Sequence, residues 1–288
     1  MQLGKKSAAE MENEEFQSEE GEMFMDSVPS TNETSGTYKF PFWAKMRSAL
    51  SEIPILRSLY WKLSLITHPS FCEDGMATMH GVEFMKDPKY MAAYKAALRH
   101  QNHTEYHWRI HTILWSASQA LKHNGDFVEC GVNRGFMSRA VIDYIDFGKQ
   151  TKRTFYLFDT FNGPVSSLIS KDDLAAHRNT YNECFEFVKN VFKDVPNVRI
   201  VRGAVPNSLS TVNISKVSYL SIDMNCAIPE AAALAHFWPK LVSGGIIILD
   251  DYAFVGYESQ RIMADSFAQS VGVKVLTLPT GQGMLVKP

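Results

Sequence analysis

Residues Gly125–Gly135 read GDFVECGVNRG, a short apolar strand at Phe127–Cys130 that runs into two glycines four residues apart. We expect a helix to begin near Phe136, and Gly131 and Gly135 would leave room for a ligand to approach the backbone of the strand-to-helix turn. Such a turn usually holds either a dinucleotide or S-adenosylmethionine. A tight turn without any ligand gives the same pattern, so this stretch alone leaves both interpretations open.

The spacing within the turn argues against a dinucleotide. The dinucleotide fingerprint G-x-G-x-x-G needs a middle glycine that lets the backbone reach the pyrophosphate, and this chain has Asn133 there. Glu129 precedes the first glycine, where a carboxylate would repel a pyrophosphate but could receive a cation or ribose hydroxyls. An NAD(P)-linked oxidoreductase remains an alternative, and so does a non-catalytic cofactor-binding or scaffolding protein.

Apolar runs typical of strands alternate with helical segments from Asp126 onward, which is the βαβ pattern of a parallel sheet. Only Pro279–Gly283 separates the last two runs, too few residues for a crossover helix, so they must form an antiparallel hairpin. We therefore predict an α/β fold with a doubly wound, mostly parallel seven-stranded sheet and an antiparallel C-terminal strand, the Rossmann-like plan of class I methyltransferases. The expected strands are Phe127–Cys130, Thr154–Phe158, Val198–Val201, Val217–Ile222, Ile246–Leu249, Val273–Leu278 and Met284–Val286.

Acidic residues follow three of these strands. Asp159 closes the second strand, where an acid is placed to bind ribose hydroxyls, or it could cap the turn at Thr160–Pro164. Asp223 follows the fourth strand, and Asp250 and Asp251 follow the fifth. Neighbouring strands present their carboxyl ends to one crevice, so we expect these three acids to converge, and an all-oxygen set suits Mg²⁺ better than zinc. In the alternative, only one of them faces the ligand and the others cap the loop.

Together these residues resemble the macrocin O-methyltransferase family, S-adenosylmethionine-dependent enzymes that methylate sugar or natural-product hydroxyls with a divalent metal. The resemblance spans roughly Asp87 to the C-terminus and includes the closing Leu278–Gly283, LPTGQG. It implies S-adenosylmethionine and Mg²⁺ as cofactors and a small-molecule hydroxyl as the methyl acceptor. The other matching segments are Gly125–Gly135, Tyr156–Gly163, Val198–Leu209, Leu220–Asn225 and Leu241–Tyr252.

The resemblance also implies roles for particular residues. Asp223, Asp250 and Asp251 would hold the metal. Better-known family members carry a second acid near the position of Asn225, so this chain offers the metal less charge. The expected cofactor site consists of Glu129, Gly131, Asn133, Gly135, Asp159, Thr160, Phe161, Gly203 and Asp223.

The family's general base is a histidine in the variable stretch after the second strand, where this chain has His177. We take His177 and Asp223 as the candidate catalytic residues, with Tyr181 as a second candidate base; His177 could instead be a surface histidine. Trp108–His111, WRIH, matches a family stretch on a helix over the cofactor pocket. His111 could therefore contact the ligand, although packing of the core or lid explains these rings as well.

The region before the catalytic core divides in two. Residues 1–38 form an acidic tail, in which nine acidic residues stand against two lysines up to Gly36, and we expect this tail to be disordered. Residues 39–123 are helical in pattern and rich in aromatic side chains, which indicates an N-terminal extension or lid. These helices could form the face of a homo-oligomer. Residues 124–288 would be the catalytic domain.

Composition limits the remaining partners. The 288 residues carry a formal net charge of −2, with no basic stripe of the nucleic-acid-binding type and no apolar run long enough to span a bilayer. The four cysteines have no motif spacing, which indicates reduced thiols. We therefore expect a cytoplasmic enzyme that binds neither nucleic acid nor membrane.

Overall fold

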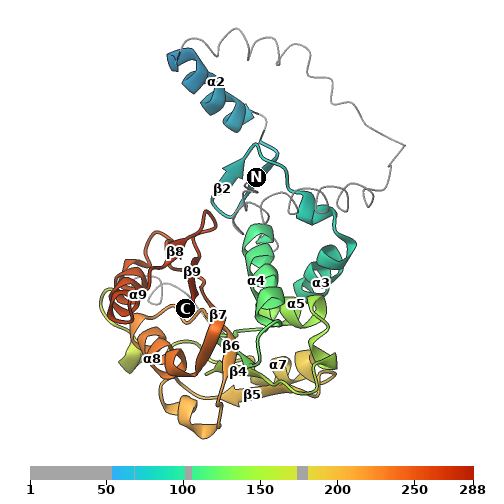
Figure 1. Cartoon of the computed structure of the whole chain (residues 1–288), viewed down its shortest axis with the longest axis vertical. Coiled ribbons are helices and arrows are strands. Elements are labelled where there is room, and N and C mark those ends of the chain that lie inside the picture. The colour runs from blue at the N-terminus through green and yellow to red at the C-terminus, as the bar shows by residue number, and fades with distance from the viewer. Residues whose placement is uncertain (1–53, 68, 101–105, 174–180) are drawn as a thin grey trace, which may run out of the picture. The chain divides into compact units, whose positions relative to one another are not determined.

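The computed structural model describes residues 54–67, 69–100, 106–173 and 181–288 (Figure 1). The chain divides into two units, Met1–Tyr60 and Trp61–Pro288, and helix α2 (Pro54–Thr67) runs through the boundary. The acidic tail expected at residues 1–38 lies outside the described residues. The division between an N-terminal extension and a catalytic domain at residue 124 stays a prediction.

A seven-stranded sheet forms the centre of the second unit. Its strands are β3 (Asp126–Cys130), β4 (Phe155–Asp159), β5 (Val198–Arg202), β6 (Val217–Ile222), β7 (Leu241–Leu249), β8 (Leu276–Thr277) and β9 (Gly283–Val286). They lie in the order β5-β4-β3-β6-β7-β9-β8; β9 runs antiparallel to both β7 and β8, and the other neighbouring pairs are parallel. The predicted fold class, a mostly parallel sheet closed by an antiparallel C-terminal strand, is confirmed.

Two strands differ in length from the prediction by more than one residue. β7 begins at Leu241 rather than Ile246, because Gly244 and Gly245 interrupt the apolar pattern without ending the strand. The strand expected at residues 273–278 is reduced to Leu276–Thr277. The backbone N–H of Val273, the first residue of the expected strand, donates to the Ala268 carbonyl oxygen near the end of the preceding helix at 2.9 Å. Val273 is therefore bonded to the end of that helix and is not part of the strand.

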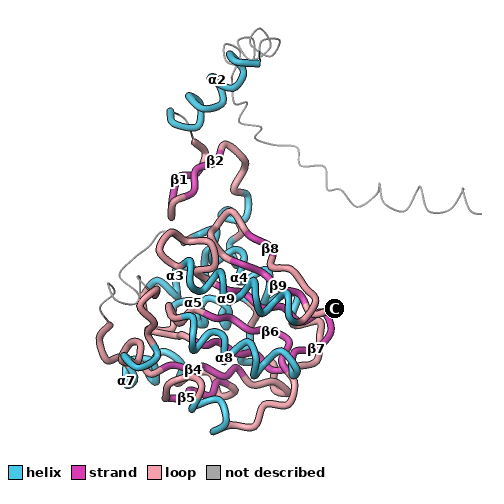
Figure 2. The backbone as a smooth tube through the Cα atoms, turned by 90° about the vertical axis from the view of Figure 1, so that its left-hand side faces the viewer, coloured by secondary structure: helices cyan, strands magenta, loops and turns pink. Residues whose placement is uncertain are grey.

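Helices cover both faces of the sheet (Figure 2). The described α-helices that lie wholly in the second unit are α3 (Pro88–Leu98), α4 (His107–Ala120), α5 (Phe136–Tyr144), α7 (Phe185–Phe192), α8 (Ala227–Phe237) and α9 (Glu258–Ser270). Side chains alternate along each strand, so Phe127 of β3 joins one core cluster with α4, α5 and α7, whereas its neighbour Val128 joins a second cluster with α8 and α9. Both residues are completely buried.

The helical N-terminal region also contains a hairpin that the sequence did not indicate. Strands β1 (Phe71–Glu73) and β2 (Met76–Thr78) pair antiparallel. The turn between them is Asp74-Gly75, whose φ angles are +50° and +74°, the left-handed backbone that an Asp-Gly pair favours in two-residue hairpin turns. Strands of three residues are too short to show a periodic pattern, which explains why only helices were expected here.

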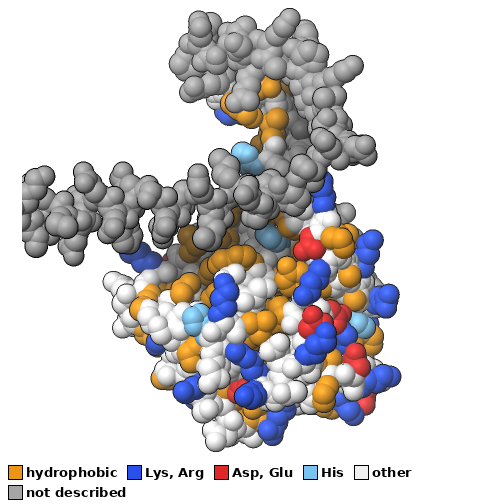
Figure 3. Space-filling model, turned by 45° about the vertical axis from the view of Figure 1, so that its right-hand side comes forward, with side chains coloured by type: hydrophobic (Ala, Val, Ile, Leu, Met, Phe, Trp, Pro, Cys, Tyr) orange, Lys and Arg blue, Asp and Glu red, His pale blue; other side chains and the backbone are white. Residues whose placement is uncertain are grey.

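No helix among residues 54–67, 69–100, 106–173 and 181–288 is long and apolar enough to cross a bilayer. On the face drawn in Figure 3, basic and acidic side chains are interspersed with hydrophobic and neutral ones. All four cysteines are unpaired.

Candidate active site

A cavity of about 320 Å³ opens at the carboxyl ends of β3, β4, β6 and β7. It lies where the strand order reverses, between β3 and β6, which is the usual ligand position in an open α/β sheet. Of the nine residues expected to bind the cofactor, Gly135 is not in the cavity wall. The other eight line it: Glu129, Gly131, Asn133, Asp159, Thr160, Phe161, Gly203 and Asp223.

The glycines of the turn after β3 are required by the packing of the protein itself. Gly131 has a φ of +91°, and a Cβ there would lie 1.8 Å from the carbonyl oxygen of Asp223. Gly135 has a φ of +86°, and its Cβ would lie 2.7 Å from a ring carbon of Phe192. The missing side chains make room for the end of β6 and for a core ring, and the approach of a ligand to this turn stays a prediction. The glycine turn and Asp223 are therefore in direct backbone contact.

The carboxylate of Asp159 holds two turns together. Its Oδ2 accepts the backbone N–H groups of Val132 at 2.6 Å and Asn133 at 2.7 Å, and its Oδ1 accepts that of Phe161 at 2.6 Å. The capping role left open by the sequence is present, and it extends to the glycine turn. Thr160 Oγ1 also lies 3.4 Å from Oδ1, but its one hydrogen is better placed for the Gly163 carbonyl oxygen at 2.6 Å. Because a carboxylate has about four lone-pair positions, Asp159 then keeps one for a further donor, and its contact with a ribose stays a prediction.

Glu129 lies one strand position before the end of β3 and is 2% exposed. Its Oε2 has no hydrogen-bond partner within the described part of the chain. Burial raises the pKa of Glu129 well above its ordinary range, and Asp223, Asp250 and Asp159 raise it further. An orphaned buried oxygen in the cavity wall is costly, so this side chain is suited to accept a hydrogen bond from a bound ligand.

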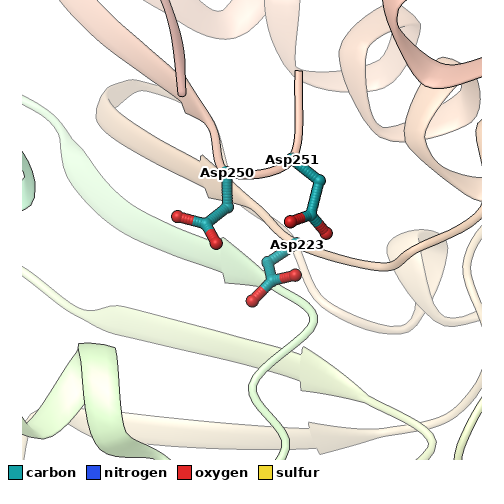
Figure 4. A group of neighbouring side chains, drawn as sticks. All are labelled: Asp223, Asp250 and Asp251. Atoms are coloured by element: carbon teal, nitrogen blue, oxygen red, sulfur yellow. The ribbon is translucent and has the colours of Figure 1, made fainter. Parts of the chain in front are cut away.

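Three carboxylates meet at the other end of the cavity (Figure 4). Asp223 follows β6, and Asp250 and Asp251 follow β7, its neighbour in the sheet. Each contributes one oxygen to a set in which all atoms lie within 4.8 Å of one another. The expected convergence of the three acids is therefore present, because the carboxyl ends of adjacent parallel strands share one edge of the sheet.

The three acids of this cluster differ in how well hydrogen-bond donors and positive charge offset their burial. Burial and the charge of Asp250 raise the pKa values of Asp223 and Asp251 well above the ordinary range. Asp250 itself is 1% exposed and has a partner at each oxygen: Arg109 Nη1 donates to Oδ2 at 2.6 Å, and Gln282 Nε2 donates to Oδ1 at 2.8 Å.

This donor set fits a hard divalent cation. All its ligand atoms are carboxylate oxygens, which Mg²⁺ prefers, and an ion between Asp223 and Asp251 would reverse the repulsion that raises their pKa values. Asn225, in place of the family's second acid, donates Nδ2 to Asp223 Oδ1 at 3.3 Å, which leaves that carboxylate three further lone-pair positions. The residues are thus compatible with the predicted metal, whose binding itself stays a prediction.

The candidate bases differ in what the structure describes. His177 lies outside the described residues, so its catalytic role stays a prediction. Tyr181 lines the cavity and packs over Gly163, whose Cβ would lie 2.9 Å from that of Tyr181. His111 is stacked on the ring of Phe84, with 4.1 Å between the ring centres, and is not among the residues that line the cavity.

Three residues that shape the site were not assigned by the sequence. Arg109 and Gln282 lie in the segments WRIH and LPTGQG, which resemble the family, but the resemblance assigned no role to either residue. Asp74 belongs to no motif, yet it accepts from Arg109 Nε at 2.7 Å and from Nη2 at 2.9 Å. A contact between residues 35 positions apart leaves no periodic signal in the sequence.

The chain is similar to known methyltransferases. A model of the family described as macrocin-O-methyltransferase (TylF) matches residues 111–275, more than half of the chain. The structure of the O-methyltransferase NovP is similar over 62% of this chain and 79% of that one, with 22% identity and a TM-score of 0.54. The structure of CalS11, a calicheamicin methyltransferase, is similar over 72% and 93%, with 16% identity and a TM-score of 0.50. At these identities the two structures show a shared fold. No curated protein sequence gives a significant match.

Proposed function

The chain belongs to the macrocin O-methyltransferase family, and we propose that it methylates a hydroxyl group of a small molecule. The methyl donor is S-adenosylmethionine, and the acceptor is a sugar or another natural product. Mg²⁺ assists the reaction at the acid cluster of Asp223, Asp250 and Asp251.

The position of Asp223 is the observation that carries this proposal. Its backbone oxygen touches the glycine turn at Gly131, while its carboxylate belongs to the acid cluster, and both features line one cavity. A methyl transfer needs donor and acceptor atoms about 3 to 3.5 Å apart and in line. A donor site at the turn and an acceptor site at the acids would meet that requirement.

The donor half of the cavity is formed by the ends of β3 and β4. Glu129 offers an unpartnered oxygen, and Asp159 offers one remaining lone pair, so both are suited to ribose hydroxyls. Asp159 also fixes the glycine turn, which keeps that half of the site in one conformation before a ligand binds. S-adenosylmethionine, when bound, supplies a methyl group that is already activated by its sulfonium.

The acceptor half is formed by the ends of β6 and β7. Asp223 and Asp251 present carboxylate oxygens there, and Asp250 is held in place by its two donors. A Mg²⁺ ion at these residues supplies a Lewis acid that lowers the pKa of an acceptor hydroxyl. His177 takes the proton in this proposal, and Tyr181, which lines the cavity, is the alternative base.

The acceptor class rests on the family and on the named relatives. NovP is an O-methyltransferase and CalS11 methylates in calicheamicin chemistry, both in line with a natural-product acceptor. The rest of the cavity wall mixes aromatic and polar side chains, among them Tyr106, Phe254 and Tyr257. Such a wall suits a glycoside or an aromatic acceptor. A cytoplasmic location and a homo-oligomer through the N-terminal helices stay predictions.

The direct test follows transfer of a labelled methyl group from S-adenosylmethionine to a panel of sugars and natural-product glycosides, with Mg²⁺ or with EDTA. We expect transfer that EDTA abolishes and Mg²⁺ restores, and that Asp251→Asn removes. Asp172→Asn, which neutralises an exposed acid outside the cavity, is the control and should behave as the unaltered protein. Full transfer in EDTA would remove the metal from the proposal.

Two outcomes would favour the other functions. Calorimetric binding of NADH without binding of S-adenosylmethionine would point to an oxidoreductase. Binding of S-adenosylmethionine without transfer to any acceptor would point to a non-catalytic binding protein.

A further inference from the structure

Arg109 connects the acid cluster to a hairpin far away in the sequence. Its Nε and Nη2 donate to the two carboxylate oxygens of Asp74, at 2.7 and 2.9 Å, in the bidentate geometry that fixes a guanidinium most firmly. Asp74 lies in the tight turn between β1 and β2. The third guanidinium nitrogen, Nη1, is 2.6 Å from Asp250 Oδ2 and 4.0 Å from Asp251 Oδ1.

The surroundings of Arg109 keep it in this position. The side chain is 11% exposed, and its guanidinium lies 4.8 Å from the ring centre of Tyr106 and 4.4 Å from that of Phe254. Burial works against its charge, but Asp250 and Asp74 more than offset that effect and raise the pKa of Arg109. Arg109 is thus permanently charged, desolvated and held from several sides.

The acid cluster beside Arg109 holds more acidic groups than this one arginine can neutralise. Asp223, Asp250 and Asp251 meet within 4.8 Å, and in the described part of the chain Arg109 is the cation that forms ion pairs with members of this cluster. Without that charge, three acids would be buried side by side with no compensation, which is strongly unfavourable.

We propose that Arg109, clamped by Asp74, is the built-in counter-charge of the acid cluster and the positioning residue for Asp250, so that this pair sets the cluster's affinity for divalent cations. The inference rests on the metal part of the proposed function. Arg109 lets the acids lie together before an ion binds, and Asp74 limits how strongly Arg109 competes with that ion, because its negative charge offsets part of the positive charge of the guanidinium.

The proposal predicts opposite effects for the two partners. Arg109→Gln removes the competing positive charge, so a divalent ion should bind more tightly. Asp74→Asn removes the negative charge that offsets part of the Arg109 charge, so the ion should bind more weakly. A unit charge about 6 Å from a divalent ion changes its binding by about tenfold, even at the dielectric constant of water.

The test uses Mn²⁺ as the probe. Its dissociation constant is measured by electron paramagnetic resonance on the full chain, together with the melting temperature in EDTA and in Mn²⁺. We expect about tenfold tighter binding for Arg109→Gln and a weakening for Asp74→Asn that is smaller, about severalfold, because Asp74 lies on the far side of the guanidinium. In EDTA, Arg109→Gln should also have a lower melting temperature than the unaltered protein. Addition of Mn²⁺ should raise the melting temperature of Arg109→Gln by more than it raises that of the unaltered protein.

Arg139→Gln is the matched control. Arg139 also pairs with two carboxylates, Asp143 at 2.6 Å and Asp194 at 2.8 Å, but it does not line the cavity. Its loss should lower the melting temperature equally with and without Mn²⁺ and leave the Mn²⁺ affinity unchanged. An arginine that serves only to pin the hairpin would behave in the same way as this control.

The proposal is overturned if the two site variants change Mn²⁺ affinity in the same direction or not at all. If Arg109→Gln does not yield folded protein, Asp74→Asn decides alone, and unchanged or tighter binding refutes the idea. Absence of Mn²⁺ binding to the unaltered chain also refutes it. Methyl transfer is measured separately, so a failure of the proposed reaction remains distinguishable from a failure of this inference.

Discussion

The carboxylate of Asp159 accepts a hydrogen bond from the backbone amide of Asn133 at 2.7 Å, so the acid after β4 holds the turn after β3. The neighbouring amide of Val132 binds the same oxygen at 2.6 Å. Two loops that line the cavity are therefore joined inside the protein. In the proposed function these loops form the donor half of the cavity, and their connection would reduce the ordering cost of binding.

Asp159→Asn tests this preorganisation. An asparagine side chain has one acceptor oxygen, and its NH₂ group would face a backbone N–H, so we expect a loss of about 1–3 kcal/mol in the free energy of unfolding. The affinity for S-adenosylhomocysteine, measured by calorimetry, should fall about tenfold, the equivalent of one lost hydrogen bond. Asp265→Asn, at an exposed acid that accepts from Tyr252, is the control and should leave that affinity unchanged. An unaltered affinity in Asp159→Asn would contradict the prediction.

Gly131→Ala should disrupt the junction between the glycine turn and Asp223. The added Cβ would lie 1.8 Å from a backbone oxygen that cannot move without shifting β6, and the φ of +91° is unfavourable for alanine. We expect a loss of more than about 3 kcal/mol in urea unfolding. Gly272→Ala is the matched control: its φ is +75° but nothing lies near its Cβ, so the backbone effect alone, about 1 kcal/mol, should remain. Equal losses in the two variants would show that the close contact is unimportant.

Asp223→Asn should separate activity from stability. Because burial and Asp250 raise the pKa of Asp223, its ionised form is unfavourable in the folded state, and an amide of the same shape relieves that strain. We expect a melting temperature in EDTA that is unchanged or higher by about 2–4 °C, and methyl transfer lower by about 100-fold or more. A variant that melts much lower in EDTA would mean that this carboxylate supports the fold.

Glu230 predicts a pH dependence of stability. Its buried carboxylate accepts the backbone N–H of Met224 at 3.2 Å and Gln260 Nε2 at 3.1 Å, and burial raises its pKa from 4.5 to about 7. Between these pH values the folded chain keeps a proton that the unfolded chain has lost. The contribution of Glu230 to the free energy of unfolding is therefore fully present below pH 4.5 and is lost as the pH rises toward 7.

Glu230→Gln should reduce this pH dependence. The slope of the unfolding free energy between pH 5 and 7, measured in urea with EDTA present, should become less negative by up to about 1.4 kcal/mol per pH unit. Glu129, Asp223 and Asp251 also have raised pKa values and should keep a residual slope of the same sign. An identical slope in the variant would show that Glu230 does not carry the effect.

The central strands could be predicted because buried parallel strands are nearly continuous apolar runs. All six residues of β6 are buried, and its predicted bounds, Val217–Ile222, agree with the structure. The edge strand β8 is exposed at both of its residues, so the pattern at its position said little about where pairing begins. The hairpin of β1 and β2 was missed because three residues cannot show a period.

The site could be predicted as far as strand order determines it. Asp223 and Asp250 follow adjacent strands, so their proximity follows from the βαβ pattern alone. The orientation of Asp159 toward the amides of the glycine turn could not be derived, because it depends on how two loops pack. The same holds for the link from Asp74 to Arg109, which joins parts of the chain with no shared pattern.

Strand β9 lies between β7 and β8, and Gln282 in the turn before it donates to Asp250. A ribosome must therefore complete residues 282–286 before Asp250 acquires its second donor and before β7 acquires its partner on that side. The hydrogen bonds of the acid cluster are therefore complete only once Gln282, 32 positions after Asp250, has been synthesised.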